Sequence, residues 1–132
     1  MSESKTHQRL VKILIEYVKR IVGPDMYCFI QSDLGDEYPL CPQTEEGFRP
    51  DVFYEYNGRL ILGEAKTSDD VARKHSLEQY YSYLKKCSLY NGKAEYVMAV
   101  PWTEYAEANN IVKKIQKDLP GKYEIKILRE II

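Results

Sequence analysis

Apolar residues recur at helical spacing in three segments of the chain. From residue 5 to 21, Leu10, Leu14 and Val18 stand four positions apart, and this spacing predicts an amphipathic helix. Gly23 followed by Pro24 predicts its end. Two further helices are predicted at 69–87, with Ser68 or Asp69 as the N-cap, and at 103–119, with Thr103 as the N-cap.

Short apolar runs between these segments predict strands. The stretch "RPDVFYEYNGRLILGEAKT", 49–67, holds two such runs joined by Asn57-Gly58. This pair is a strong hairpin signal, because both central positions of a type I′ turn need a positive φ. A long loop rich in glycine, proline and acids, 32–48, precedes the hairpin. The other strands are predicted at 26–31, at 94–100 and, near an edge of the sheet, at 122–132.

The predicted elements follow in the order α-β-β-β-α-β-α-β, which indicates an α/β fold. Three antiparallel strands followed by a crossover helix predict a mixed sheet with helices on both faces. The strands 51–56, 60–66 and 94–100 are apolar at nearly every position, as expected for a sheet covered on both sides. At 132 residues, the chain 1–132 is expected to form one domain.

The two-residue turn also predicts the pairing of the hairpin. Tyr56 faces Arg59 across the turn, and counting back along both strands places Asp51 opposite Glu64. Opposed side chains in a sheet have Cβ atoms about 4.5–5.5 Å apart, so two like charges meet there unfavourably. Lys66 is two residues beyond Glu64 and therefore points to the same face.

A divalent cation would remove the conflict between the two carboxylates. Mg²⁺ takes one or two carboxylates and keeps several waters or phosphate oxygens. Such an ion polarises a phosphodiester and lowers the pKa of a bound water. Lys66 would hold or activate that water, or offset charge in the transition state. The alternative is a surface hairpin with a Lys–Glu–Asp cluster and no chemistry.

At this point the sequence resembles a known nuclease superfamily. Pro50-Asp51 followed by Glu64-Ala65-Lys66 is similar to the PD-(D/E)xK motif of the restriction-endonuclease-like nucleases. The resemblance covers most of the chain, and the predicted order contains that superfamily's αβββαβ core with an added C-terminal helix and strand. It implies that Asp51 and Glu64 bind Mg²⁺ or Mn²⁺, that the Ala65 carbonyl is a further metal ligand, and that Lys66 is the catalytic lysine.

The second predicted helix carries a polar stripe. His75, Gln79 and Tyr83 stand four residues apart and share one side of it. Gln79 with Tyr83 is similar to the Q-x-x-x-Y motif of RecB-like and lambda-exonuclease-like members, where the motif lies beside the active site and helps contact DNA. His75 is expected to touch a substrate phosphate. The alternative is a stripe that simply faces solvent.

The first helix is where this sequence departs from the family pattern. Many members have a glutamate there that completes the metal shell. Glu16 is the only acid inside the predicted helix, and it lies off the apolar stripe. Glu3 precedes the helix. The sequence leaves open whether either residue serves.

Composition adds limits on location and partners. Cys28, Cys41 and Cys87 fit neither a disulfide framework nor a zinc site, and they suggest a reducing, cytoplasmic setting. The first residues lack the apolar region of a signal peptide, and no run is long enough to cross a membrane. The formal net charge of −1 gives no global attraction to nucleic acid. The first two helices are basic, however, so they would form either a local positive groove or ordinary solvated faces.

These observations predict a Mg²⁺- or Mn²⁺-dependent nuclease acting on DNA. One small domain has little room to read base sequence, so structure- or end-dependent cutting is expected. Cutting two strands would call for a homodimer. The first alternative is a catalytically inactive nuclease-like domain that binds nucleic acid or a protein partner, and a more distant one is an unrelated αβ interaction module.

Overall fold

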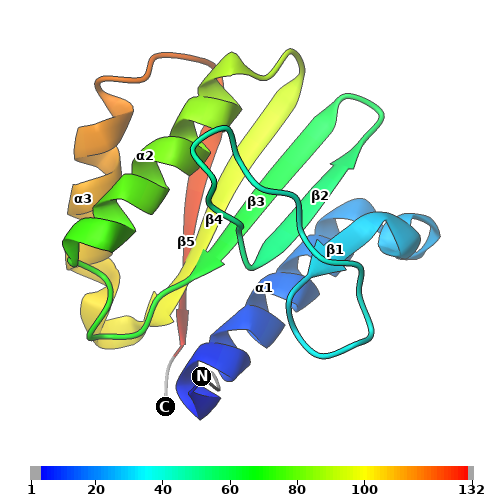
Figure 1. Cartoon of the computed structure of the whole chain (residues 1–132), viewed down its shortest axis with the longest axis horizontal. Coiled ribbons are helices and arrows are strands. Elements are labelled where there is room, and N and C mark those ends of the chain that lie inside the picture. The colour runs from blue at the N-terminus through cyan, green and yellow to red at the C-terminus, as the bar shows by residue number, and fades with distance from the viewer. Residues whose placement is uncertain (1–3, 131–132) are drawn as a thin grey trace.

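The structure, a computed structural model, describes residues 4–130 and consists of a mixed sheet flanked by helices (Figure 1). None of the helices within this part of the chain is long and apolar enough to cross a lipid bilayer. The helices are α1 (Lys5–Val22), α2 (Lys74–Leu89) and α3 (Tyr105–Gln116), with the short 3-10 helices η1 (Pro24–Phe29) and η2 (Trp102–Glu104). The strands are β1 (Ile30–Ser32), β2 (Val52–Tyr56), β3 (Arg59–Ala65), β4 (Lys93–Pro101) and β5 (Glu124–Glu130).

The five strands lie side by side in the order in which they occur along the chain. The first three pair antiparallel, whereas β3, β4 and β5 run parallel. Parallel neighbours need a crossover connection, which α2 and α3 supply. α1 packs on one face of the sheet, and α2 and α3 pack on the other (Figure 1). The predicted element order and the mixed α/β sheet covered on both faces are therefore confirmed.

The hairpin β2–β3 has the register that its turn predicts. Asn57 and Gly58 have φ angles of 52° and 78°, which a type I′ turn requires. Tyr56 faces Arg59, and the pairing continues to Val52 opposite Gly63. One step further back, the amide of Asp51 donates a hydrogen bond of 3.0 Å to the Gly63 carbonyl. The predicted register is therefore confirmed from the turn to Val52, whereas Asp51 departs from it, because its amide binds the same residue, Gly63, that Val52 faces.

Each face of the sheet has its own hydrophobic core. The core under α1 packs side chains such as Leu14 and Val18 against Ile61 and Val97 of the sheet. The other core lies between the sheet and the pair α2 and α3. Cys41 and Cys87 are buried in this second core as free thiols.

The predicted strand 26–31 is wrong for most of its length. Residues Pro24–Phe29 form the 3-10 helix η1, and only the short β1 follows. Gly23 has a φ of 87°, and Pro24, with its fixed φ, occupies the first turn of that helix. The ring of Phe29 stacks on Tyr56 at a centroid distance of 4.0 Å, which uses its apolar surface without a strand.

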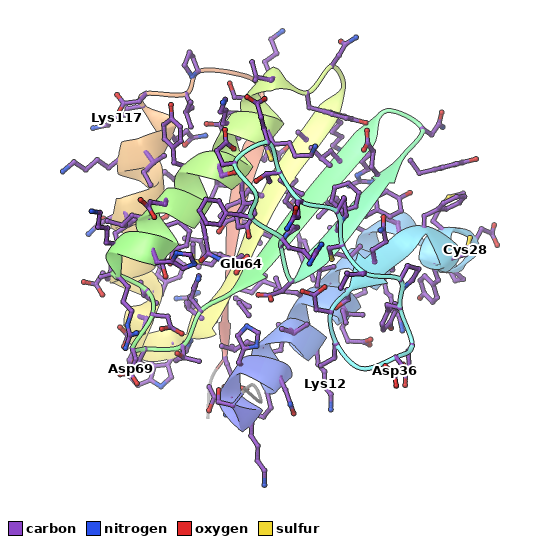
Figure 2. All side chains as sticks on the ribbon, viewed as in Figure 1. Lys12, Cys28, Asp36, Glu64, Asp69 and Lys117 are labelled. Carbon is purple, nitrogen blue, oxygen red and sulfur yellow. The ribbon has the colours of Figure 1, made fainter. Side chains whose placement is uncertain are left out.

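The predicted start of the second helix is also wrong. The segment after β3 forms a turn in which the amide of Asp70 donates to the Thr67 carbonyl at 3.0 Å. The Thr67 hydroxyl donates to the Asp70 carboxylate at 3.2 Å, so this acid stabilises the turn. Asp69 consequently lies in a loop at the rim of the molecule (Figure 2), and the helix begins after Arg73.

The third helix begins later than predicted, and the last strand is shorter. Thr103 lies inside η2 and donates to the neighbouring Glu104 at 3.0 Å, so it is not the N-cap of α3. The final strand is Glu124–Glu130 and lies at an edge of the sheet, as predicted, while residues 131 and 132 lie outside the described part.

Candidate functional site

Three ionisable side chains gather at the end of the hairpin remote from its turn. Asp51 directly precedes β2, Glu64 lies in β3 and Lys66 directly follows it; they are 8%, 4% and 7% exposed. Side chains alternate along a strand, so Glu64 and Lys66 share the face on which Leu62 contacts the α2 and α3 core, and the charge of Asp51 acts on Glu64 from the open end of the hairpin. Figure 2 shows Glu64 well inside the outline of the molecule. The hairpin thus buries three ionisable side chains near its open end, although the pairing predicted for Asp51 and Glu64 is not part of the observed register.

Asp51 is held in position from two directions. Its Oδ2 accepts a hydrogen bond of 2.9 Å from the amide of Ala65, so the carboxylate reaches across to the end of β3. The Nε2 of His7, on the first turn of α1, lies 3.3 Å from the same oxygen. The Ser32 hydroxyl donates to the Asp51 carbonyl at 2.8 Å. These contacts leave the carboxylate little freedom to turn away from Glu64.

Lys66 is positioned between β3 and α2. Its backbone amide donates to the Ala99 carbonyl of β4 at 3.0 Å, which continues the parallel pairing past the end of β3. Its ammonium lies 3.8 Å from Glu64 Oε1 and donates a hydrogen bond to Gln79 Oε1. The Tyr80 ring lies 5.9 Å from the same ammonium. Gln79 therefore fixes the lysine beside the carboxylates.

The pKa of Glu64 is raised well above its ordinary value of 4.5, mainly by burial. The charge of Asp51 raises this pKa further, and Lys66 opposes both effects. The Tyr83 hydroxyl lies close enough to lower the pKa slightly, although it does not meet hydrogen-bond geometry. A single lysine is therefore not enough positive charge for two buried carboxylates.

Three buried polar atoms near this site have no hydrogen-bond partner. They are Glu64 Oε2 and the hydroxyls of Tyr83 and Tyr96. An unpaired buried polar atom costs about 1–3 kcal/mol, so such atoms are rare and informative. Two other buried tyrosines are satisfied: Tyr80 donates to the Val71 carbonyl at 2.8 Å and Tyr123 to the Leu119 carbonyl at 2.6 Å.

The donor set fits a hard divalent cation. Two carboxylates, one with a buried unpaired oxygen, match the one or two carboxylates by which proteins hold Mg²⁺ together with waters and substrate oxygens. A cation would also supply the positive charge that Glu64 lacks. Within residues 4–130, however, no three side chains of His, Cys, Asp or Glu are grouped so as to hold a metal. The amide of Ala65 is at the site, whereas the role of its carbonyl remains a prediction.

The structure brings two of the three polar residues of the α2 stripe to this site. Gln79 binds Lys66, and Tyr83 is fully buried beside Glu64. For these two residues, the alternative of a stripe facing solvent is wrong. His75 lies nearer the start of α2, is exposed, and packs edge-on against Phe48 at 5.5 Å. It is therefore outside the buried cluster, and its contact with substrate remains a prediction.

The first helix supplies a histidine where the family pattern suggests an acid. Glu16 is exposed and lies 3.8 Å from Lys19, on the side of α1 that faces residues 34–38, so it is not a member of the site. Glu3 lies outside the described residues. His7 is the residue of α1 that reaches Asp51, and sequence reasoning missed it. His7 lies in the first turn of α1, where its amide donates a hydrogen bond of 3.1 Å to the Ser4 hydroxyl, and nothing in the local sequence links it to Asp51.

The acidic loop 32–48 lies against the basic helices. Lys85 of α2 binds Glu46 at 2.8 Å and lies 3.8 Å from Glu45. On α1, Lys12 lines a cleft of about 480 Å³ together with Asp36 of the loop, and the two lie near each other in Figure 2. Part of the positive charge of α2 is thus balanced within the chain.

Comparisons with protein-family models, with curated proteins and with solved structures find no match for this chain.

Proposed function

We propose that this protein is a Mg²⁺- or Mn²⁺-dependent nuclease of the PD-(D/E)xK type that hydrolyses DNA phosphodiester bonds. The observation that carries the proposal is the buried cluster of Asp51, Glu64 and Lys66, with the ammonium 3.8 Å from a Glu64 oxygen. The order of elements supports it, because α1, three antiparallel strands, α2 and the parallel β4 follow the restriction-endonuclease-like αβββαβ core. α3 and β5 are the additions.

Each residue has a role in this proposal. Asp51 and Glu64 would hold the metal ion, with the Ala65 carbonyl as a further ligand. When bound, the ion would polarise the phosphodiester and lower the pKa of a coordinated water. Lys66, held by Gln79, would orient the attacking water and stabilise the negative charge that develops on the phosphate oxygens. Hydrolysis then forms a bond from the water oxygen to phosphorus and breaks the bond to the leaving oxygen.

The substrate is expected to be recognised through its shape or its ends. A positive surface binds the phosphate backbone in a salt-dependent way and reads no sequence. Because Lys85 is paired with Glu46, this lysine contributes less to such binding than the sequence suggests. His75 is exposed and free to meet a phosphate from solvent. Cutting both strands of a duplex would require a second copy, which light scattering of the protein in solution detects.

The test is a cleavage assay on single-stranded, duplex and branched DNA with Mg²⁺ or Mn²⁺. Lys66→Ala should lower the rate at least about a hundredfold, as removal of a group that stabilises transition-state charge does. Chelation of the metal should abolish cleavage. Lys113→Ala, which removes an exposed lysine of α3, is the matched control and should cleave normally. Equal rates for wild type and Lys66→Ala would overturn the proposal.

One observation favours the second candidate, a nuclease-like domain that binds nucleic acid or a protein without cutting. The part of the chain from residue 4 to 130 offers no group of three side chains that could hold a metal. Titration calorimetry separates the two functions. Binding of DNA without any binding of Mn²⁺ would favour the inactive domain, whereas Mn²⁺ binding that requires Asp51 favours the nuclease.

A further inference from the structure

The three unpaired polar atoms form one buried group around Glu64. Tyr83 comes from α2 and Tyr96 from β4, and their rings stack at 6.1 Å with an angle of 26° between them. Both tyrosines are fully buried in the core between the sheet and α2. After burial, the charge of Glu64 is the largest influence on the pKa of both hydroxyls, and it raises each. In the parallel pairing of β3 and β4, Tyr96 faces Leu62, two residues before Glu64 on the same face of the sheet, so both tyrosines lie on the side of the sheet that carries Glu64.

The two oxygens of Glu64 have different surroundings. Oε1 lies 3.8 Å from the Lys66 ammonium, on the side of the proposed chemistry. Oε2 is buried without a partner, as are both hydroxyls. A hydroxyl can donate and a carboxylate oxygen can accept, so the three atoms complement one another. None of the three hydrogen-bonds another, and a buried water, which typically makes about three hydrogen bonds to such atoms, would bridge them.

We propose that Tyr96, together with Tyr83, is a positioning residue that holds Glu64 Oε2 through an ordered water and so presents Oε1 to the metal. The inference rests on the proposed function, because it concerns how Glu64 is oriented as a ligand of the proposed metal ion. It adds Tyr96, a β4 residue outside the D…ExK and QxxxY patterns, to the machinery of the site. When a group that hydrogen-bonds to a metal ligand and orients it is lost, metal affinity typically falls 10–100-fold.

The experiment compares two substitutions that each remove one phenolic oxygen. Tyr96→Phe removes the proposed partner of Glu64. Tyr123→Phe removes the hydroxyl that donates to Leu119, in another part of the same core. Mn²⁺ affinity is measured by calorimetry without DNA, and thermal stability by circular dichroism in chelator. We expect Tyr96→Phe to bind Mn²⁺ about tenfold more weakly. Tyr123→Phe should bind as wild type does but melt at a lower temperature.

A crystal structure of the metal-free protein is the second measurement. It should show an ordered water within hydrogen-bonding distance of the Tyr96 hydroxyl and Glu64 Oε2. Unchanged Mn²⁺ affinity in Tyr96→Phe, or a dry site in the crystal, would overturn the inference. If wild type binds no Mn²⁺ at all, the proposed function fails instead, and the crystal structure still decides whether the water links Tyr96 to Glu64.

Discussion

Gly63 is the position where the smallest added group should disturb the site most. An added Cβ would lie 3.2 Å from the Val52 Cβ and 3.6 Å from the methyl carbons of Leu14. Opposed Cβ atoms normally lie about 4.5–5.5 Å apart, so β2 and β3 would have to separate or α1 would have to shift. Overpacking of this kind costs about 1–3 kcal/mol. Gly→Ala also lowers the conformational entropy of the unfolded chain, which stabilises the folded protein by about 0.4–1 kcal/mol. The net loss expected for Gly63→Ala is therefore roughly 0.5–2 kcal/mol.

The rate of the proposed cleavage should be affected more strongly than the free energy of unfolding. The Asp51 amide donates to the Gly63 carbonyl, and Glu64 is the next residue, so any movement of β2 against β3 displaces the two carboxylates. A misplacement of about 1 Å is enough to lower a rate about a hundredfold. Urea unfolding followed by circular dichroism gives the stability, and the cleavage assay gives the rate.

A double-mutant cycle identifies the cause. Val52→Gly removes the Cβ that the new methyl would meet, so the pair with Gly63→Ala should be less destabilised than the sum of the single changes. A coupling of at least about 0.5 kcal/mol is expected for residues in contact. Additive effects, or a Gly63→Ala protein as stable and active as wild type, would show that the close approach of the strands does not control the site.

Three further outcomes are expected. In chelator, the raised pKa of Glu64 means that its contribution to stability is complete below about pH 4.5 and is lost as the pH rises through the higher folded pKa. The free energy of unfolding in urea should therefore fall less between pH 5 and pH 8 for Glu64→Gln than for wild type. An equal fall in both proteins would contradict this. His7→Ala removes a contact of the Asp51 carboxylate and should weaken Mn²⁺ binding about tenfold by calorimetry, whereas an unchanged isotherm would make that contact incidental. His75→Ala should weaken DNA binding in a filter or polarisation assay and leave Mn²⁺ affinity as it is; unchanged DNA affinity would remove His75 from the substrate path.

The hairpin could be predicted because its information is local. Two adjacent residues, Asn57 and Gly58, determine the turn, and the turn determines which side chains oppose each other. Alternation then assigns faces, so the amino-acid sequence is enough to place Glu64 and Lys66 together. Each step depends on neighbours along the chain or directly across one pair of strands.

The predicted secondary structure is wrong where a side chain makes a contact that sequence spacing does not reveal. The run 26–31 has the composition of a strand, yet Phe29 packs its ring on Tyr56 instead. Ser68 and Asp69 are residue types that commonly cap helices, yet the next residue, Asp70, accepts a hydrogen bond from Thr67 and stabilises a turn, so α2 begins later. In both cases a tertiary or turn contact outweighed local propensity.

The residues that form the site were predictable only in part, because some of them come from segments that are distant in sequence. Spacing places Gln79 and Tyr83 on one side of their helix, and the resemblance to the Q-x-x-x-Y motif, rather than the spacing, predicted that this side lies beside the site. His7 and Tyr96 reach the site from α1 and β4, and no local pattern connects either residue to Glu64 or Asp51. Such contacts between distant segments depend on how the layers pack, which spacing alone does not specify.

The arrangement of strands also has a consequence for how the protein folds. Because the order in the sheet is the order in the chain, every strand pairs with the strand that was synthesised just before it. A nascent chain could therefore extend the sheet one edge at a time, without inserting a strand between two others. Contacts close in sequence accompany fast folding, whereas distant ones slow it. The slowest step is then expected to be the docking of α1, which must wait for β3 and β4 before its buried face is covered.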